Sequence, residues 1–208
     1  MTELTTGWRA VLSHPRVYEA VQHAVGARSW LRRFVQETVK PIPGQTMIDI
    51  GCGPAAILNY LPEVDYCGFD HSEAYIAAAK KRFGSRPGVR FFCADASAFQ
   101  QFGVGPFEIA TAIGLLHHLD DKQVLDLFVN VREMLTPDGH LFTADPCYFD
   151  GQPRITRRII SSDRGQHVRS FDSYLALGRK VFPAVTASLT AGLFPFPHAV
   201  CEVTCSGK

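Results

Sequence analysis

The sequence predicts an α/β fold with a doubly wound, mostly parallel sheet of seven strands, preceded by N-terminal helices and ended by an antiparallel hairpin. Two observations support this prediction. Strand-like and helix-like segments alternate from residue 46 onward, which favours a parallel sheet with helices on both faces. The segment 107–113, FEIATAI, is almost entirely apolar, as expected of a strand that is buried on both faces.

The first forty residues have helical spacing. Apolar residues recur from Val17 to Val25 and again from Trp30 to Val35, and a segment rich in Pro and Gly at 41–44 then ends the pattern. The region that follows is expected to hold five strands and four helices. The strands lie near 46–50, 65–69, 89–93, 107–113 and 139–145, and the helices near 54–61, 72–83, 95–101 and 121–135.

The pattern changes after residue 145. Residues 151–180 carry a local excess of positive charge. Two strand-like segments then follow at 185–191 and 198–206, with a short Pro-containing connection, and they indicate an antiparallel pair at the sheet edge. We therefore expect a single domain in four parts, at 1–44, 45–146, 147–182 and 183–208.

Composition limits the function classes. The chain has 208 residues, 46% of them hydrophobic and 20% charged, as in an ordinary globular domain. A net charge of +1 disfavours nucleic acid and membrane surfaces as partners, although the basic segment 151–180 keeps nucleic acid open. The sequence shows neither an apolar signal core nor a run of ~18 apolar residues, which predicts a cytoplasmic protein. The six cysteines form no CxxC pair, so we expect buried thiols and no metal site.

The most informative segment is MIDIGCGPA at 47–55, followed by YCGFD at 66–70. A strand that runs into a Gly-Cys-Gly turn before a helix lets the backbone pass close to a ligand, and the helix start offers N–H groups. An acid about twenty residues later, at the tip of the next strand, can accept hydrogen bonds from both hydroxyls of a ribose. This layout predicts a site for a nucleoside-bearing cofactor, with Asp70 as the ribose acceptor.

Together the motifs resemble those of the class I S-adenosylmethionine-dependent methyltransferases, most of all the small stand-alone members that act on small molecules. The resemblance covers about residues 45–146 and rests on the segments DIGCGPA, FD, CADAS, ATAIGLLHHLDD and LTPDGHLFTADP. It implies a Rossmann-like fold, S-adenosylmethionine as the cofactor and methyl transfer to an oxygen or nitrogen of a small molecule. In these terms 1–44 would be a helical lid, 45–146 the cofactor-binding core and 147–182 a substrate cover.

The glycine turn and its neighbours would hold the methionine half of this cofactor. Asp49 would hold the aminoacyl end. The backbone at Gly51, Cys52 and Gly53 would line the methionyl part. Ile113 ends the fourth strand at the same edge of the sheet, where ligands of open α/β sheets bind. A structural explanation stays open for these positions, because a tight turn needs glycine and Asp49 could accept bonds from its own turn.

The adenine end is assigned partly by resemblance. Asp95 and Ala96 resemble the family's adenine-edge pair, with the acid accepting from the exocyclic amine, although Asp95 could instead cap a helix. His71 follows Asp70 and would flank the adenine or be an ordinary surface histidine. In relatives an N-terminal helix closes over the cofactor, often with a tyrosine, which points to Tyr18.

The chemistry is assigned to paired histidines. The resemblance places His117 and His118 beside the transferred methyl group, with His117 as a general base or substrate-orienting residue and His118 in contact with substrate. Histidine suits proton transfer because its ordinary pKa is close to neutral pH. In the substrate cover, Tyr148, His167 and Arg169 are expected to contact the methyl acceptor, and a solvated charged surface is the alternative.

Two other functions remain open. The turn also fits the GxGxxA pattern of dinucleotide-binding folds. An NAD(P)-dependent reductase is disfavoured, because Asp49 stands where those folds keep an apolar residue. A catalytically silent, cofactor-binding subunit that supports a partner enzyme is the second alternative, because Ala56 stands where many relatives have glycine. The sequence leaves the acceptor, the methylated atom and the oligomeric state unassigned.

Overall fold

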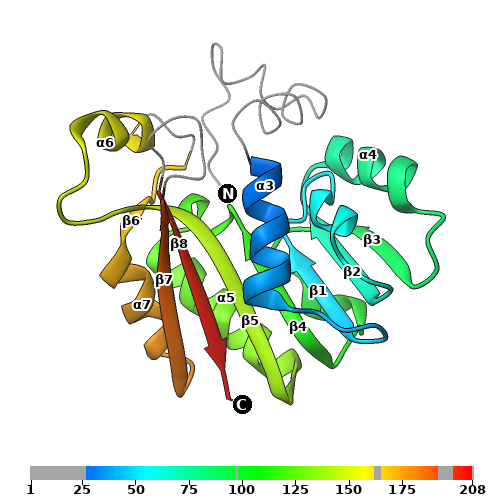
Figure 1. Cartoon of the computed structure of the whole chain (residues 1–208). Coiled ribbons are helices and arrows are strands. Elements are labelled where there is room, and N and C mark those ends of the chain that lie inside the picture. The colour runs from blue at the N-terminus through cyan, green and yellow to red at the C-terminus, as the bar shows by residue number, and fades with distance from the viewer. Residues whose placement is uncertain (1–26, 97, 162–164, 192–198, 208) are drawn as a thin grey trace.

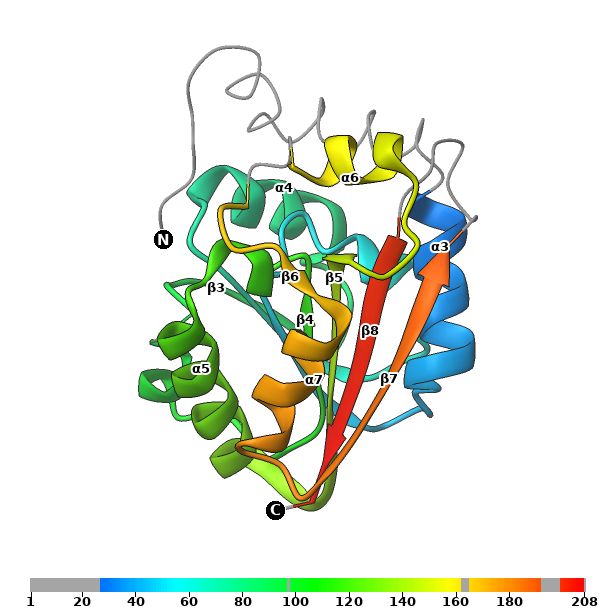
Figure 2. The ribbon, with the colours of Figure 1, turned by 90° about the vertical axis from the view of Figure 1, so that its left-hand side faces the viewer.

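The structure, a computed structural model, describes residues 27–96, 98–161, 165–191 and 199–207. Its centre is one twisted sheet with helices on both faces (Figures 1 and 2). The strands are β1 (Thr46–Ile50), β2 (Asp65–Asp70), β3 (Val89–Cys93), β4 (Phe107–Ile113), β5 (Leu135–Tyr148), β6 (Arg169–Ser170), β7 (Ala184–Ala191) and β8 (Ala199–Ser206).

The strand order is β3-β2-β1-β4-β5-β8-β7. The first five strands pair in parallel, and β8 lies antiparallel between β5 and β7. The predicted doubly wound parallel sheet with a C-terminal antiparallel hairpin is therefore confirmed. One strand was not predicted: β6 has two residues, pairs with the end of β5 and is too short to show an alternating pattern.

The helices fill the crossovers. The α-helices are α3 (Ala27–Arg33), α4 (Glu73–Phe83), α5 (Asp121–Met134), α6 (Arg154–Ser161) and α7 (Phe171–Arg179). A π-helical segment, Phe34–Val39, continues α3. Start signals are local: the Ser72 hydroxyl accepts the Tyr75 N–H, and Asp120 forms a capping box with Gln123 at the start of α5.

The predicted helix at 54–61 is wrong for most of its length. The structure has a single 3-10 turn there, Ala56–Asn59, and Ala55 before it takes a left-handed φ of 56°. Pro62 also disfavours helical backbone at the preceding residue, so little room is left before β2. The predicted helix at 95–101 is likewise a 3-10 turn, Phe99–Phe102. An α-helix N-terminus therefore does not follow the glycine turn, and a short 3-10 turn replaces it.

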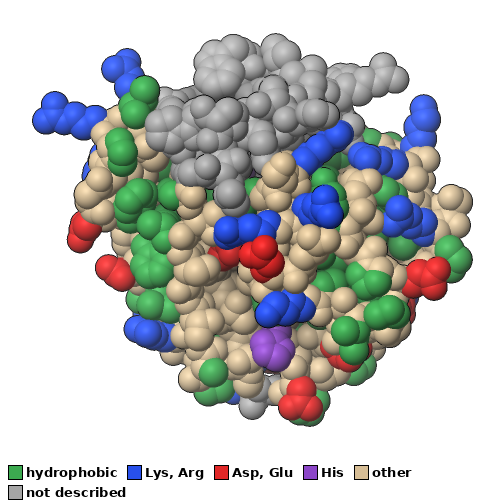
Figure 3. Space-filling model, in the orientation of Figure 1, with side chains coloured by type: hydrophobic (Ala, Val, Ile, Leu, Met, Phe, Trp, Pro, Cys, Tyr) green, Lys and Arg blue, Asp and Glu red, His purple; other side chains and the backbone are tan. Residues whose placement is uncertain are grey.

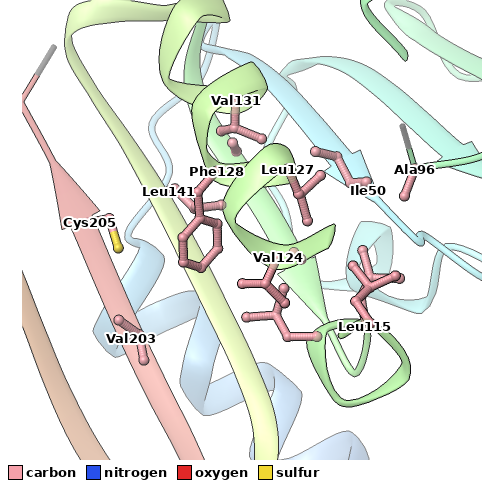
Figure 4. Close-up of a cluster of buried hydrophobic side chains, with 14 of the residues drawn as sticks. Ile50, Ala96, Leu115, Val124, Leu127, Phe128, Val131, Leu141, Val203 and Cys205 are labelled. Atoms are coloured by element: carbon pink, nitrogen blue, oxygen red, sulfur yellow. The ribbon is translucent and has the colours of Figure 1, made fainter. Parts of the chain in front are cut away.

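Two apolar clusters hold the layers together. One joins the sheet to α5 and α7, and Figure 4 shows Val124, Leu127 and Phe128 of α5 against Leu141 of β5. The other joins the opposite face to α3 and α4, through residues such as Trp30. Each fully buried apolar side chain of this kind contributes about 1.5–3 kcal/mol. Together the clusters fix the edge where β1, β2 and β4 end.

The carboxyl ends of the parallel strands meet at one edge of the sheet, and α6 lies over that edge (Figure 2). The predicted segment 17–25 and the connection of the C-terminal hairpin lie outside the described residues. All six cysteines lie within them, and five are buried while Cys93 is exposed.

In the part of the chain that the structure describes, no helix has the length and apolar character to cross a membrane. Nor does any group of three or more His, Cys, Asp or Glu in these residues have the arrangement of a metal site. On the face in Figure 3, the coloured Lys and Arg side chains are spread among acidic, apolar and neutral ones.

Candidate functional site

The glycine turn after β1 is fixed directly to the end of β2. Asp70 is 6% exposed, and its Oδ2 accepts the Gly53 N–H at 2.8 Å while its Oδ1 accepts the Ser72 N–H at 2.8 Å. The Gly51 N–H donates to the Phe69 carbonyl oxygen at 2.8 Å. Gly51 and Gly53 have φ values of 72° and 53°, which only glycine adopts without strain. The acid expected at the strand tip is thus in place beside the turn.

Asp49 lies beneath the turn and is 3% exposed. Its Oδ1 accepts the Thr111 hydroxyl and its Oδ2 accepts the Tyr66 hydroxyl, each at 2.7 Å. Burial raises the pKa of this carboxyl from its ordinary 3.8 to about 6, although the two hydroxyl bonds oppose the shift. A cation placed beside Asp49 would favour its charged form.

A recess of about 80 Å³ opens beside the turn. Pockets that hold a whole drug-sized ligand measure ~300–1,000 Å³, so this lining would enclose one end of a cofactor. Five of the expected cofactor residues meet here, and α3 adds two apolar side chains that the sequence did not single out. The lining is Trp30, Leu31, Asp49, Gly51, Cys52, Gly53, Pro54, Ala56, Ile57 and Ile113.

The residues expected at the adenine end lie along the next strand ends. His71 Nδ1 is 3.6 Å from Asp70 Oδ1, and the His71 side chain is 42% exposed. Asp95 is exposed in the segment after β3, and Ala96 beside it is buried. Tyr18 lies outside the described residues. The structure thus brings His71 close to Asp70 and leaves the Asp95 residue exposed at the end of the neighbouring strand.

His117 is held by the end of β5. It lies in a 3-10 turn, Leu116–His118, and its Nδ1 is 2.7 Å from Asp145 Oδ1. The His117 backbone N–H donates to the same oxygen at 3.2 Å. Both residues are buried, at 6% and 1% exposure. A carboxylate at Nδ1 favours the tautomer in which Nδ1 carries the proton and Nε2 is the accepting nitrogen.

Asp145 was missed by sequence reasoning. Its signal is the one that identified Asp49 and Asp70, an acid in an otherwise apolar strand near its carboxyl end. The pairing with His117 spans 28 residues and depends on β4 and β5 being neighbours. The second histidine, His118, stacks at a tilt on the first, with ring centroids 4.1 Å apart.

Arg169 was expected to contact substrate, and the structure gives it other partners. Its guanidinium donates to the carbonyl oxygens of Leu116 and Leu119 at 2.8 and 2.7 Å, and to Asp121 Oδ1 at 2.8 Å. The residue is 9% exposed. Arg169 therefore fixes both ends of the histidine turn, and backbone carbonyl groups occupy the hydrogen-bond donors that a substrate would need.

Of the other two residues expected in the substrate cover, His167 lies against the same turn. The His167 backbone N–H donates to the His117 carbonyl oxygen at 3.0 Å. A Cβ added to Gly165 would collide with the His117 ring, so this part of the cover lies directly on the histidine. Tyr148 ends β5, and the Arg157 guanidinium of α6 lies over its ring at 5.1 Å.

Comparisons with known proteins point to a methyltransferase domain. Residues 48–141 match the family model of a methyltransferase domain. Phosphoethanolamine N-methyltransferase 3 of Arabidopsis thaliana is 26% identical over 168 residues, which are 79% of this chain and 34% of that protein. The chain thus spans about a third of the length of this curated relative.

Solved structures show the same fold. The mitomycin 7-O-methyltransferase superposes with a TM-score of 0.68 at 16% identity, over 96% of this chain and 58% of its own. Human N-acetylserotonin methyltransferase, solved with S-adenosylmethionine, gives 0.67 at 14% identity, over 95% and 56%. The family model over residues 48–141 and the shared fold agree with the resemblance of the motifs to the class I S-adenosylmethionine-dependent methyltransferases.

Proposed function

We propose that this chain transfers the methyl group of S-adenosylmethionine to an oxygen or nitrogen atom of a small molecule. The observation that supports this best is the buried Asp145–His117 pair. The segment that leads into the histidine turn lies against the glycine turn, because a Cβ on Gly51 would meet the side chain of Leu115, two residues before His117, at 3.2 Å. Relatives named as an N-methyltransferase and an O-methyltransferase support the same reaction class.

The recess fits the aminoacyl end of this cofactor. The α-ammonium group would lie near Asp49, whose pKa is raised by burial and would fall again beside a cation. The methylene groups of the cofactor would pack against the apolar side chains of Trp30, Leu31 and Ile113. At Gly53 there is open space where a side chain would stand, so a ligand can approach the backbone there.

Asp70 is the proposed ribose acceptor. The bonds from the Gly53 and Ser72 N–H groups fix the orientation of this carboxylate at the strand end, and a carboxylate can accept charge-assisted bonds from the two hydroxyls of a ribose. His71 and Asp95 are the proposed contacts of the adenine, together with Ala96 and, from the helical lid, Tyr18.

When bound, S-adenosylmethionine supplies a methyl group on a cationic sulfur. His117 would accept the proton of the acceptor's hydroxyl or amine at Nε2, and Asp145 would stabilise the imidazolium cation that forms. An acceptor that arrives deprotonated would need only orientation by the same ring. Because both residues are buried, water is kept away from the proton being moved.

The acceptor would bind beneath the substrate cover at 147–182. His118, Tyr148 and His167 are the proposed contacts, since each lies in or beside a segment that borders His117. Arg169 is proposed to position the histidine turn. The unbridged cysteines fit a reducing compartment, and we propose a cytoplasmic location.

Calorimetry with S-adenosylhomocysteine and, separately, NADPH tests the cofactor. We expect the first to bind and the second not to bind. The reverse result would replace the proposal with a dinucleotide-dependent reductase. Transfer of a labelled methyl group to a panel of small amines, phenols and carboxylic acids tests the activity. Tight binding of S-adenosylhomocysteine without transfer to any compound would instead favour a catalytically silent subunit.

A further inference from the structure

Glu202 of β8 is a buried carboxylate that the proposed reaction does not use. It is 4% exposed, and its Oε1 accepts the Trp30 indole N–H at 2.9 Å and the Thr190 hydroxyl at 2.8 Å. The Thr38 hydroxyl donates to Oε2 at 3.3 Å. The donors come from α3, the π-helical segment and β7, so one side chain ties three elements to the last strand.

The Arg33 guanidinium is linked to the Glu202 carboxylate through the hydroxyl group of Thr190. The Arg33 guanidinium donates to the Thr190 hydroxyl oxygen at 2.9 Å, and that hydroxyl donates to Glu202. A buried carboxylate is costly unless its lone pairs are satisfied, and here both oxygens have donors. The arrangement is therefore a complete hydrogen-bond network, in which removal of Glu202 leaves several donors unpaired.

Trp30 links this network to the recess. Its indole has a single donor, and Glu202 accepts it. One face of the ring stacks on Phe34, with centroids 5.3 Å apart, while Trp30 and Leu31 also line the recess. The stacking sets the plane of the indole, and the hydrogen bond sets its rotation within that plane. Through this bond β8 determines the position of the Trp30 indole, which forms part of the apolar lining of the recess.

We infer that Glu202 is a positioning residue for cofactor binding, which acts through the Trp30 indole on the wall that receives the aminoacyl end. The inference rests on the proposed function, because it takes the recess to be the cofactor site. It predicts that affinity for the cofactor is controlled from a strand that does not itself line the recess.

Two substitutions and a matched control distinguish a positioning role of Glu202 from a general loss of folding stability. Glu202→Met keeps the volume and removes the acceptor, whereas Glu202→Gln keeps an acceptor oxygen for the indole. Val203→Ala is the control, because the adjacent Val203 side chain is buried in the other apolar cluster, against α5 and α7. All three variants should unfold at lower temperature than the wild type.

S-adenosylhomocysteine affinity, measured by calorimetry at a temperature where all variants are folded, gives the decisive comparison. We expect Glu202→Met to weaken binding roughly tenfold, Glu202→Gln to recover most of that loss and Val203→Ala to bind like the wild type. The Trp30 indole N–H resonance, assigned with Trp30→Phe, should move and exchange faster with water in Glu202→Met only.

The outcomes distinguish the two proposals. A wild-type chain that does not bind S-adenosylhomocysteine would overturn the proposed function and this inference with it. Wild-type binding with the same affinity in Glu202→Met would overturn the inference alone. Equal losses in Glu202→Met and Val203→Ala would also overturn it, because affinity would then follow stability and not the indole.

Discussion

The Asp70 carboxylate accepts the Gly53 backbone N–H at 2.8 Å, so the end of β2 holds the turn that follows β1. The same carboxylate accepts the Ser72 N–H at the start of α4. One acid thus holds the glycine turn and the start of the next helix, and it is also the proposed ribose acceptor. Its scaffold role and its proposed ligand role are coupled, and both should be lost together.

Asp70→Ala should weaken S-adenosylhomocysteine binding by about tenfold or more, because bonds to a charged group contribute ~1.5–3 kcal/mol each. The melting temperature should fall as well, since two backbone N–H groups lose their acceptor. Asp65→Ala, at the other end of β2, is the control. Its ion pair with Arg90 is about half exposed and contributes only ~0–1 kcal/mol. Unchanged calorimetric affinity in Asp70→Ala would remove Asp70 from the cofactor site.

His117→Ala should lower turnover by about tenfold or more while S-adenosylhomocysteine affinity stays near the wild-type value. The reason is that His117 is the proposed base, whereas the recess is lined by other residues. Steady-state rates with the first acceptor found by screening give the measurement. His140→Ala, on β5 and stacked on Phe142, is the matched histidine control. Wild-type turnover in His117→Ala would exclude a role in the chemistry.

The raised pKa of Asp49 predicts how cofactor affinity depends on pH. At pH 5 the buried carboxyl is mostly protonated, and at pH 7 it is mostly charged. A ligand ammonium beside it favours the charged form, so calorimetric affinity for S-adenosylhomocysteine should rise from pH 5 to pH 7. Asp49→Asn should bind more weakly at pH 7 and lose this dependence. A flat wild-type profile would contradict the placement of the ammonium at Asp49.

Asp49 also has a predictable effect on stability. Its pKa is raised in the folded chain, so between pH 3.8 and about 6 the folded state binds more protons than the unfolded state. Stability from this group is therefore present at low pH and falls as pH rises through that window, by ~3 kcal/mol at most. Asp49→Asn should unfold at a higher temperature than the wild type at pH 7, and at a similar one near pH 4.

The sequence predicted the parts of the site that depend on local order. The glycine turn, Asp49 and Asp70 follow from one strand–turn pattern repeated on neighbouring strands, and the parallel order brings them to one edge. Asp145 had the local signal of an acid near the end of an apolar strand but not its pairing with His117, and Glu202 becomes informative only through a partner far away in the chain. The Trp30–Glu202 bond joins residues 172 positions apart, and local periodicity carries no signal for such a pair.

Arg169 also shows that the sequence does not predict contacts between residues that are far apart in the chain. The sequence predicted that Arg169 contacts the substrate, with a solvated charged surface as the alternative, because a basic segment is a weak guide to what each arginine contacts. Its guanidinium donates to the Leu116 carbonyl oxygen 53 positions earlier, a contact made by the folded chain and not by any motif. Burial, at 9% exposure, distinguishes it from the exposed arginines of α6.

Arg169→Lys should lower the melting temperature, because one ammonium cannot replace the guanidinium at both Leu116 and Leu119, and each buried carbonyl left unpaired costs about 1–3 kcal/mol. Turnover should fall with little change in S-adenosylhomocysteine affinity, since the histidine turn and not the recess is disturbed. Arg154→Lys, exposed on α6, is the control for the charge-preserving change. A loss confined to the KM of the acceptor would instead support direct substrate contact by Arg169.

Gly165→Ala tests whether the substrate cover rests on His117. The added Cβ would collide with the His117 ring and its carbonyl oxygen, so either the cover or the imidazole must move. Because a misplacement of about 1 Å at a reacting group can cost up to ~10²-fold in rate, turnover should fall sharply while S-adenosylhomocysteine binding is kept. Gln166→Ala, at an exposed neighbouring position, should behave like the wild type. Full turnover in Gly165→Ala would mean that the cover lies away from the histidine during catalysis, and that His117 meets its acceptor without the contact seen here.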